Sequence, residues 1–133
     1  GGPALAEKEG KKIALSGYDV VSYFTKNRAE KGDPKYTHDH KGATYQFSSD
    51  EQKKLFINDP GKYLPQYDGY CAYGVTFGKK LEADPEAWKI VNGKLYFNLD
   101  KDLLKKWETN TADFIKEGDS QWTVIQDIPA SEL

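Results

Sequence analysis

The sequence has few of the side chains that bind soft or borderline metal ions or act as nucleophiles. It has one cysteine, Cys71, two histidines, His38 and His40, and no methionine. A single cysteine cannot form a disulfide within the chain, so Cys71 is a packed small hydrophobic residue, a reactive thiol or a metal ligand. The missing methionine indicates a processed or trimmed chain, from which a removed export signal would leave no trace.

Charge of one sign and long apolar runs are also scarce. The formal net charge is only −2, without the clustered Lys and Arg of a nucleic-acid surface, so we expect no nucleic-acid partner. No stretch approaches the roughly 20 apolar residues of a membrane helix, so we expect no transmembrane segment. The glycines are scattered and lack the Lys-Ser/Thr of a phosphate-binding loop, and no nucleophile elbow is recognisable.

Two β-hairpins are predicted from turn residues that tolerate a positive φ. Lys41-Gly42 and Asn92-Gly93 each interrupt a segment rich in aromatic and β-branched residues. The predicted arms are 36–40 with 43–47, and 87–91 with 94–97. Tyr45 and Phe47 are expected on one face of the first hairpin.

Helices are predicted after each hairpin. Ser48-Ser49 precedes Glu51 and Gln52 as a capping pattern, so a helix should run to about Asn58, with Leu55 and Phe56 buried. Asp100 caps a second helical region, which is either one bent helix or two short ones. Its apolar stripe comprises Leu103, Leu104, Trp107, Phe114 and Ile115.

The remaining segments are less regular. The segment 17–24 is compatible with a short helical turn, and 60–85 with loop and one short helix. No internal repeat is recognisable, and 133 residues suit one domain. We therefore predict a small single α+β domain in which antiparallel β-hairpins pack against short helices. Its predicted parts are an N-terminal segment 1–12, disordered or derived from trimming, a domain over 13–126 and a C-terminal tail 127–133.

Several ordered motifs resemble the YHS-domain family, specifically its single-domain, often exported bacterial branch. They are GYDVVSYF (17–24), GATYQFSS (42–49), FINDPGKYLPQY (56–67) and GYCAYGV (69–75), followed by Trp88 and NGKLY (92–96). Members of the wider family accompany copper and heavy-metal transporters and some multicomponent oxygenases. The resemblance therefore implies metal handling more than catalysis, and an exported location.

The chain departs from the family where the metal-associated members carry two cysteines around a helix start. Ser48 and Gln52 stand at those places. Hydroxyl and amide groups are poor ligands for soft or borderline ions, so the family's usual metal site is not carried over. We expect Ser48 and Gln52 to act in helix capping instead.

His38 and His40 are the remaining candidates for metal ligands. Their i, i+2 spacing places both imidazoles on one face of a strand, an arrangement that can hold Cu(II), Zn(II) or Ni(II). Cys71 as a third ligand would raise the affinity. The alternatives are two ordinary surface histidines or a pH-sensitive contact.

Two further functions remain open. Tyr63, Tyr67, Tyr70 and Tyr73 would line a pocket for a small planar ligand, or a surface for a protein partner, if they face solvent. An enzyme would use Cys71 as nucleophile, with a histidine as base and Asp39 or Asp68 orienting it. Aromatic residues more often fill a core, and no motif supports catalysis.

The sequence thus predicts a non-catalytic binding domain whose favoured ligand is a copper or zinc ion. We expect a periplasmic or secreted protein, with the cytoplasm as the alternative location.

Overall fold

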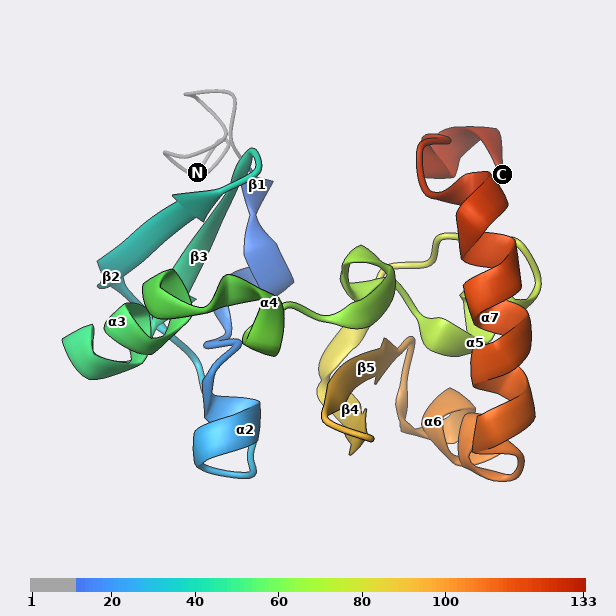
Figure 1. Ribbon diagram of the computed structural model, residues 1–133, viewed down its shortest axis with the longest axis horizontal. Coiled ribbons are helices and arrows are strands. Elements are labelled where there is room, and N and C mark those ends of the chain that lie inside the picture. The colour runs from blue at the N-terminus through green and yellow to red at the C-terminus, as the bar shows by residue number, and fades with distance from the viewer. Residues whose placement is uncertain (1–11) are drawn as a thin grey trace. The chain divides into compact units, whose positions relative to one another are not determined.

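The computed structural model describes residues 12–133, which divide between Leu64 and Pro65 into two compact units. We name them the first unit and the second unit (Figure 1). Each combines helices with antiparallel strands, so the predicted α+β class is confirmed. The predicted N-terminal segment 1–12 lies, apart from Lys12, outside the described residues, and the limits 13–126 stay a prediction.

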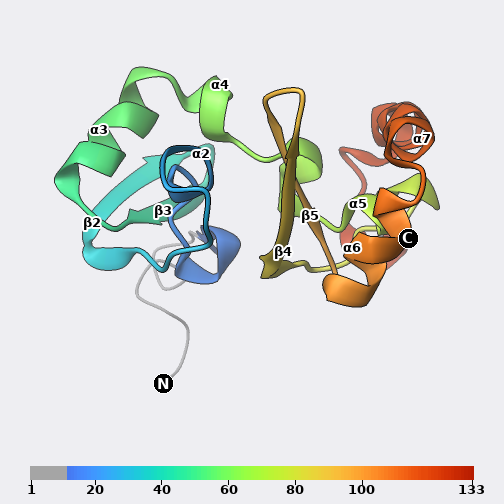
Figure 2. The ribbon, with the colours of Figure 1, turned by 90° about the horizontal axis from the view of Figure 1, so that it is seen from below.

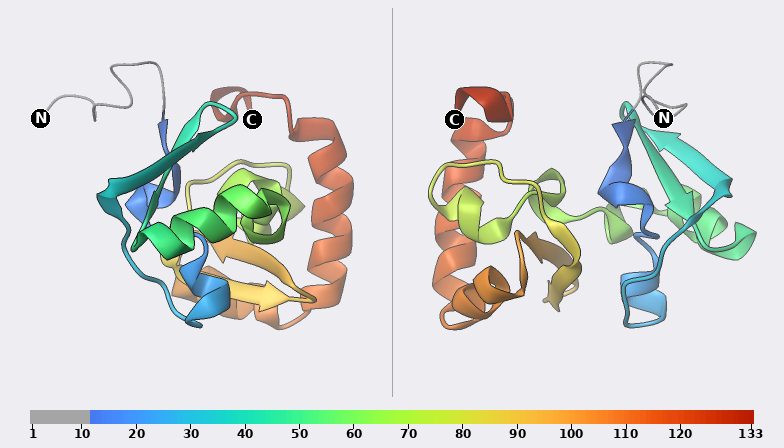
Figure 3. Two further views of the ribbon diagram at one scale, coloured as in Figure 1. Left: turned by 60° about the vertical axis from the view of Figure 1, so that its left-hand side comes forward. Right: turned by 180° about the vertical axis from the view of Figure 1, so that it is seen from behind.

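The first unit contains strands and short helices in alternation. Its elements are β1 (Lys12–Ile13), the turn η1 (Ala14–Gly17), α2 (Ser22–Thr25), β2 (Asp33–His40), β3 (Ala43–Phe47), α3 (Asp50–Asn58) and α4 (Pro60–Tyr63). The strand order is β1-β3-β2, with β1 parallel and β2 antiparallel to β3 (Figure 3).

The second unit has one hairpin and the longest helix. Its elements are the turn η2 (Gln66–Gly69), α5 (Ala72–Thr76), β4 (Asp84–Val91), β5 (Lys94–Asn98), α6 (Lys101–Glu108), α7 (Thr111–Ile125) and the turn η3 (Ala130–Glu132). Figure 2 shows the hairpin β4–β5 with α6 and α7 following it along the chain. No helix within residues 12–133 has both the length and the apolar character needed to cross a bilayer.

Both predicted hairpins are present. Lys41 and Gly42 have φ angles of 47° and 82°, and Asn92 and Gly93 have 51° and 75°. Two consecutive left-handed residues suit the right-handed twist of a two-residue hairpin. The two helical regions are also found, and the second is two helices, α6 and α7, separated at Thr109 and Asn110.

Helix α3 has the predicted start, but only one of its two predicted buried residues, Phe56, is buried. Ser49 caps this helix by accepting the Gln52 N–H at 3.2 Å. Phe56 is fully buried and packs against Tyr45 and Phe47, whose rings lie 5.0 and 5.2 Å from it. Leu55, which we predicted to be buried, is 41% exposed because it lies one residue, or about 100°, around the helix from Phe56.

The core of the second unit lies between α5, β5, α6 and α7. Its buried members are Tyr67, Ala72, Val75, Tyr96, Trp107 and Ile125. Ile128 and Leu133, from the segment predicted as a tail, pack against this core.

The two hairpins have the same register. Each β2–β3 pair recurs 51 residues later, so that His38 opposite Tyr45 corresponds to Lys89 opposite Tyr96. The register of the strand pairing also shifts at the same place in each hairpin, after Asp33 and after Asp84. Such agreement extends beyond the turn and indicates a repeated structural unit.

The elements around the hairpins repeat as well. Ser49 and Asp100, also 51 residues apart, each accept the backbone N–H three residues on. Trp107 lies 5.2 Å from Tyr96, as Phe56 lies beside Tyr45. Before each hairpin, three consecutive residues have positive φ: Leu15, Ser16 and Gly17 in η1, and Tyr67, Asp68 and Gly69 in η2.

The prediction that the chain has no internal repeat is therefore wrong. The signal in the sequence is short: an Asp-Pro pair whose proline lies eight residues before a glycine, and a tyrosine three residues after that glycine. It occurs at Asp33-Pro34 with Gly42 and Tyr45, and at Asp84-Pro85 with Gly93 and Tyr96. Most other paired positions differ in residue type, which is why the repeat escapes inspection of the sequence.

Candidate functional site

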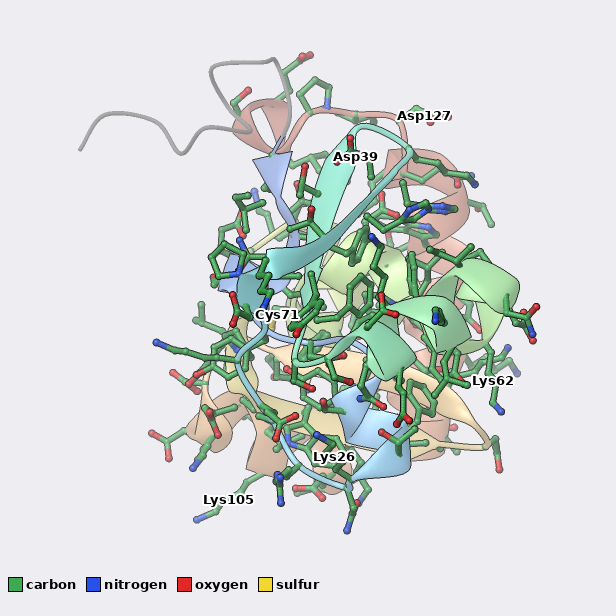
Figure 4. The ribbon with its side chains drawn as sticks, turned by 90° about the vertical axis from the view of Figure 1, so that its left-hand side faces the viewer. Lys26, Asp39, Lys62, Cys71, Lys105 and Asp127 are labelled. Atoms are coloured by element: carbon green, nitrogen blue, oxygen red, sulfur yellow. The ribbon has the colours of Figure 1, made fainter. Side chains whose placement is uncertain are left out.

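Cys71 is a buried structural residue at the start of α5. Its side chain is fully buried, and Sγ accepts the Gly74 N–H and donates to Asn98 Oδ1, both at 3.5 Å. Burial raises the pKa of the Cys71 thiol, against the opposing effect of nearby backbone N–H groups. A neutral, enclosed thiol is a poor nucleophile and a poor metal ligand. Figure 4 labels Cys71.

Asp19 is the counterpart of Cys71 in the first unit, and sequence reasoning missed it. Its Oδ1 accepts the N–H groups of Val21 and Ser22 at 2.8 and 3.2 Å. Its Oδ2 accepts from Ser48 N, Ser48 Oγ and Gln52 Nε2 at 2.8, 3.0 and 3.4 Å. This fully buried carboxylate thus joins α2 to the end of β3 and to α3.

One sequence signal connects the two positions. Asp19 follows Gly17-Tyr18, and Cys71 follows Gly69-Tyr70. In both cases the pair leaves a left-handed turn and leads into a short helix. We name Asp19 and Cys71 the hub residues of their units.

The side chains of Ser48 and Gln52 make structural contacts, but they do not have the capping role predicted for them. Ser49, not Ser48, caps α3. Ser48 binds the hub carboxylate, and the Gln52 side chain reaches both that carboxylate and, at 3.1 Å, Ser22 Oγ. Ser48 and Gln52 therefore help to hold the first unit together through the buried Asp19 carboxylate.

The polar network of the first unit continues to the surface through Glu30. Ser22 Oγ donates to Glu30 at 3.0 Å, and Lys26 and Arg28 bind the same carboxylate at 2.7 and 2.8 Å. Hydrogen bonds from Lys26 and Arg28 lower the pKa of Glu30 to about 2, although desolvation opposes them. Both cations are thus engaged by a carboxylate.

His38 and His40 lie on one face of β2, as predicted. Their rings meet the buried Phe56 ring edge-on, at 6.2 and 5.7 Å. His40 also lies 6.4 Å from Tyr45, and its Nε2 is enclosed without a hydrogen-bond partner. The intervening Asp39 points to the other face and accepts from Thr44 Oγ1 at 2.8 Å.

The histidines belong to the first unit and Cys71 to the second. Within the described part of the chain, no group of three or more His, Cys, Asp or Glu side chains is placed to hold a metal ion. The shared site of His38, His40 and Cys71 stays a prediction without structural support, and the burial of the thiol argues against it.

The four predicted pocket tyrosines are not gathered on an open surface. Tyr63 and Tyr67 are buried, whereas Tyr70 and Tyr73 are half-buried. Tyr63 packs in the first unit against Phe24 at 5.4 Å. In the second unit the Tyr67 hydroxyl donates to Asp119 at 2.8 Å. The pKa of Tyr67 is raised, chiefly by burial and to a lesser extent by this carboxylate.

One aromatic group of the second unit does reach the surface. Phe77 is 61% exposed and lies 5.1 Å from Tyr73, which lies 5.4 Å from Phe114. Lys106 Nζ lies 5.8 Å from the Tyr73 ring centre. We name Tyr73, Phe77 and Phe114 the aromatic patch; sequence reasoning did not identify it, because exposure of Phe77 has no local signal.

Comparison of the chain with protein-family models, with curated proteins and with solved structures gives no match. The resemblance to YHS domains therefore stays a prediction from the motifs.

Proposed function

We propose that this protein is a non-catalytic binding protein that holds a copper or zinc ion through His38 and His40. The observation that carries the proposal is the pair of imidazoles on one face of β2, with His40 Nε2 lacking a hydrogen-bond partner. A buried polar atom without a partner calls for an explanation, and a metal ion beside a second imidazole supplies one. Figure 4 labels Asp39, which lies between the two histidines in the sequence.

Imidazole nitrogen suits Cu(II) and Zn(II), whereas Cu(I) prefers sulfur ligands. Because Cys71 is buried within the second unit, we propose a divalent ion held by two protein ligands. Two ligands leave coordination positions for water or for a partner's side chain. Such a site exchanges its ion readily, which suits handling of a metal better than permanent storage.

The state of the thiol also supports a binding role over a thiol enzyme. Catalysis by Cys71 needs an accessible thiolate next to a base. Burial favours the neutral thiol, and the proton of that thiol is directed at the Asn98 side chain. A periplasmic or secreted location, and membership of the YHS-like branch, are part of the same proposal.

Calorimetric titration of metal-free protein with Cu(II) and Zn(II) tests the site. The second unit supplies substitutions compatible with the hairpin, because Lys89 and Val91 occupy the strand positions of His38 and His40. We expect one ion per chain, and loss of binding in both His38→Lys and His40→Val.

Two controls separate the alternatives. Asp39→Ala, on the opposite face of β2, should retain binding, and so should Cys71→Ala if circular dichroism shows that it is folded. Loss in Cys71→Ala would restore the three-ligand site. Equal binding in the two histidine variants and the unaltered protein would reject a histidine site.

A protein partner is the second candidate, favoured by the aromatic patch. An exposed phenylalanine that packs on Tyr73, whose ring also contacts Phe114, resembles the aromatic anchors that dominate interface energetics. If the partner is a second copy of this chain, sedimentation velocity at increasing protein concentration tests the proposal, with Phe77→Ser as the comparison. Concentration-dependent association that Phe77→Ser removes would support a self-interaction surface, and identical behaviour of both proteins would reject it.

A further inference from the structure

The core of the second unit contains two hydrogen-bond donors without acceptors. They are Asn98 Nδ2 and Trp107 Nε1, and both side chains are fully buried. Within residues 12–133, His40 Nε2 is the third buried side-chain atom of this kind. Buried Trp N–H groups usually find an acceptor, and a buried amide without its partner is rare in folded proteins.

The orientation of the Asn98 amide is fixed by its neighbours. Oδ1 accepts the Tyr73 N–H at 3.0 Å and the Cys71 thiol at 3.5 Å. Exchanging the amide oxygen and nitrogen would place an NH₂ group against the Tyr73 N–H, so that two donors would face each other. Nδ2 therefore occupies the branch of the amide directed away from these two partners.

From the repeat we infer that Asn98 and Trp107 are neighbours. They occupy the positions of Phe47 and Phe56, whose ring centres are 5.2 Å apart in the first unit. The surrounding frame is the same, because Trp107 packs on Tyr96 as Phe56 packs on Tyr45. The pair that is wholly apolar in the first unit is thus a pair of donors in the second.

The repeat also shows what a ligand at this place would do. In the first unit, Gln52 of α3 reaches the hub carboxylate directly. Its counterpart in α6 is Leu103, which has no polar side chain. A molecule that accepts from both Asn98, which binds the hub thiol, and Trp107 would supply the missing connection between α6 and the hub.

We propose that the second unit encloses one water molecule that accepts hydrogen bonds from Asn98 Nδ2 and Trp107 Nε1. The ligand must be an acceptor because both groups are donors. It must also be small and uncharged, because an amide and an indole provide no positive charge to balance a buried anion. Water meets these requirements and typically makes about three hydrogen bonds when buried.

Water–protein cross-relaxation in nitrogen-15-labelled protein tests the proposal. We expect the Trp107 Hε1 and Asn98 Hδ2 protons to show cross-peaks to water, with the sign of a long-lived bound molecule. The half-buried Trp88 and Trp122 serve as internal references for indole groups at the surface. Absence of a long-lived water contact at either Trp107 or Asn98 would overturn the proposal.

Trp107→Phe is the matched variant, because it installs the residue found at the same position of the first unit. It should weaken the water cross-peak of Asn98, which loses the second holder of the same molecule. A cross-peak of unchanged intensity in a folded variant would show that the water is not shared. If the variant does not fold, the spectra of the unaltered protein still decide whether both donors contact bound water.

A halide titration distinguishes water from an anion. We expect the Trp107 Hε1 resonance to be insensitive to bromide replacing chloride at constant ionic strength. A saturable shift of this resonance, with Trp88 and Trp122 unaffected, would assign the site to an anion and overturn the assignment to water.

Discussion

At the scale of single residues, Cys71 shows how burial decides chemistry. The same thiol on an open surface would be a reactive nucleophile, but here its sulfur is enclosed between Gly74 and Asn98. Burial raises the pKa of Cys71, which lowers its thiolate fraction at neutral pH. We expect native protein to react with a chromogenic disulfide reagent only as fast as it opens, and denatured protein to react at once. Complete reaction of the native protein at the rate of a free thiol would contradict this assignment.

Glu30 gives the first unit a stability that depends on pH. Lys26 and Arg28 lower the pKa of Glu30 from 4.5 to about 2. A carboxyl group with a lower pKa in the folded state stabilises the fold above its unfolded pKa, and this contribution disappears as pH falls through the folded value. The free energy of unfolding of the native protein should exceed that of Glu30→Gln at neutral pH.

The difference between these two proteins should shrink as pH falls from about 4.5 towards about 2. Urea denaturation at a series of pH values measures it. The ion pairs are partly exposed, so the effect is expected to be small and to weaken in salt. A difference that stays constant across this range would show that the carboxylate charge is not its source.

At the scale of elements, the packing of α7 depends on a glycine. A Cβ at Gly118 would lie 2.7 Å from the Tyr67 hydroxyl oxygen and 3.2 Å from Cζ. Gly118→Ala should therefore destabilise the protein by about 1–2 kcal/mol, despite the better helix propensity of alanine. In a Tyr67→Phe background the closest contact is absent, and the same substitution should cost less. Equal costs in the two backgrounds, measured by urea denaturation, would exclude this contact as the cause.

The two hairpin turns differ in how well their residues suit the backbone. Lys41 has a φ of 47°, a conformation that Asn92 adopts at the same position of the second hairpin. Asparagine tolerates this region better than lysine does, so Lys41→Asn should stabilise the protein by about 0.5 kcal/mol. Asn92→Lys should have the opposite effect. Thermal unfolding of the two variants checks the signs, and shifts in the same direction would contradict the explanation.

The hairpins were predictable because their turns are specified locally, by Lys41-Gly42 and Asn92-Gly93. Ser49 and Asp100 likewise identify the helix starts through hydrogen bonds to the next turn of chain. Burial was less predictable: Leu55 and Phe56 are adjacent and both apolar, yet only the position relative to β3 decides which is covered. Local chemistry therefore predicts elements better than it predicts the faces they bury.

At the scale of the whole molecule, the candidate site was only half predictable. The spacing of His38 and His40 fixes their common face on a strand, but nothing in the sequence places Cys71 in a different unit. The role of Asp19 depends on Ser48 and Gln52, which are about 30 residues away along the chain. Long-range hydrogen bonds of this kind require the fold before they can be recognised.

Each unit has its own hub, so damage to one should remain local. Asp19→Ala leaves several buried donors without an acceptor and should cost the first unit about 3 kcal/mol. Amide hydrogen exchange should accelerate in β2, β3 and α3 while protection in β4, β5 and α6 is retained. Asp50→Ala, which removes a surface ion pair with Lys54, is the control with little expected effect. Uniform acceleration across both units would show that they open together.

Comparison of the two units also distinguishes the structural features that they share from the positions at which they differ. The hub, the left-handed turn and the aromatic pair of strand and helix define the unit. The residue opposite the tyrosine of that pair, on the first strand of each hairpin, does not. There the first unit carries His38, and the second carries Lys89, whose ammonium group pairs with Glu108 at 2.7 Å. A chain that contains two copies of one scaffold can change the residues of one strand face to suit a ligand in the first unit. The matching face of the second unit can keep an ordinary charged pair, whereas a chain with a single copy has only one such face.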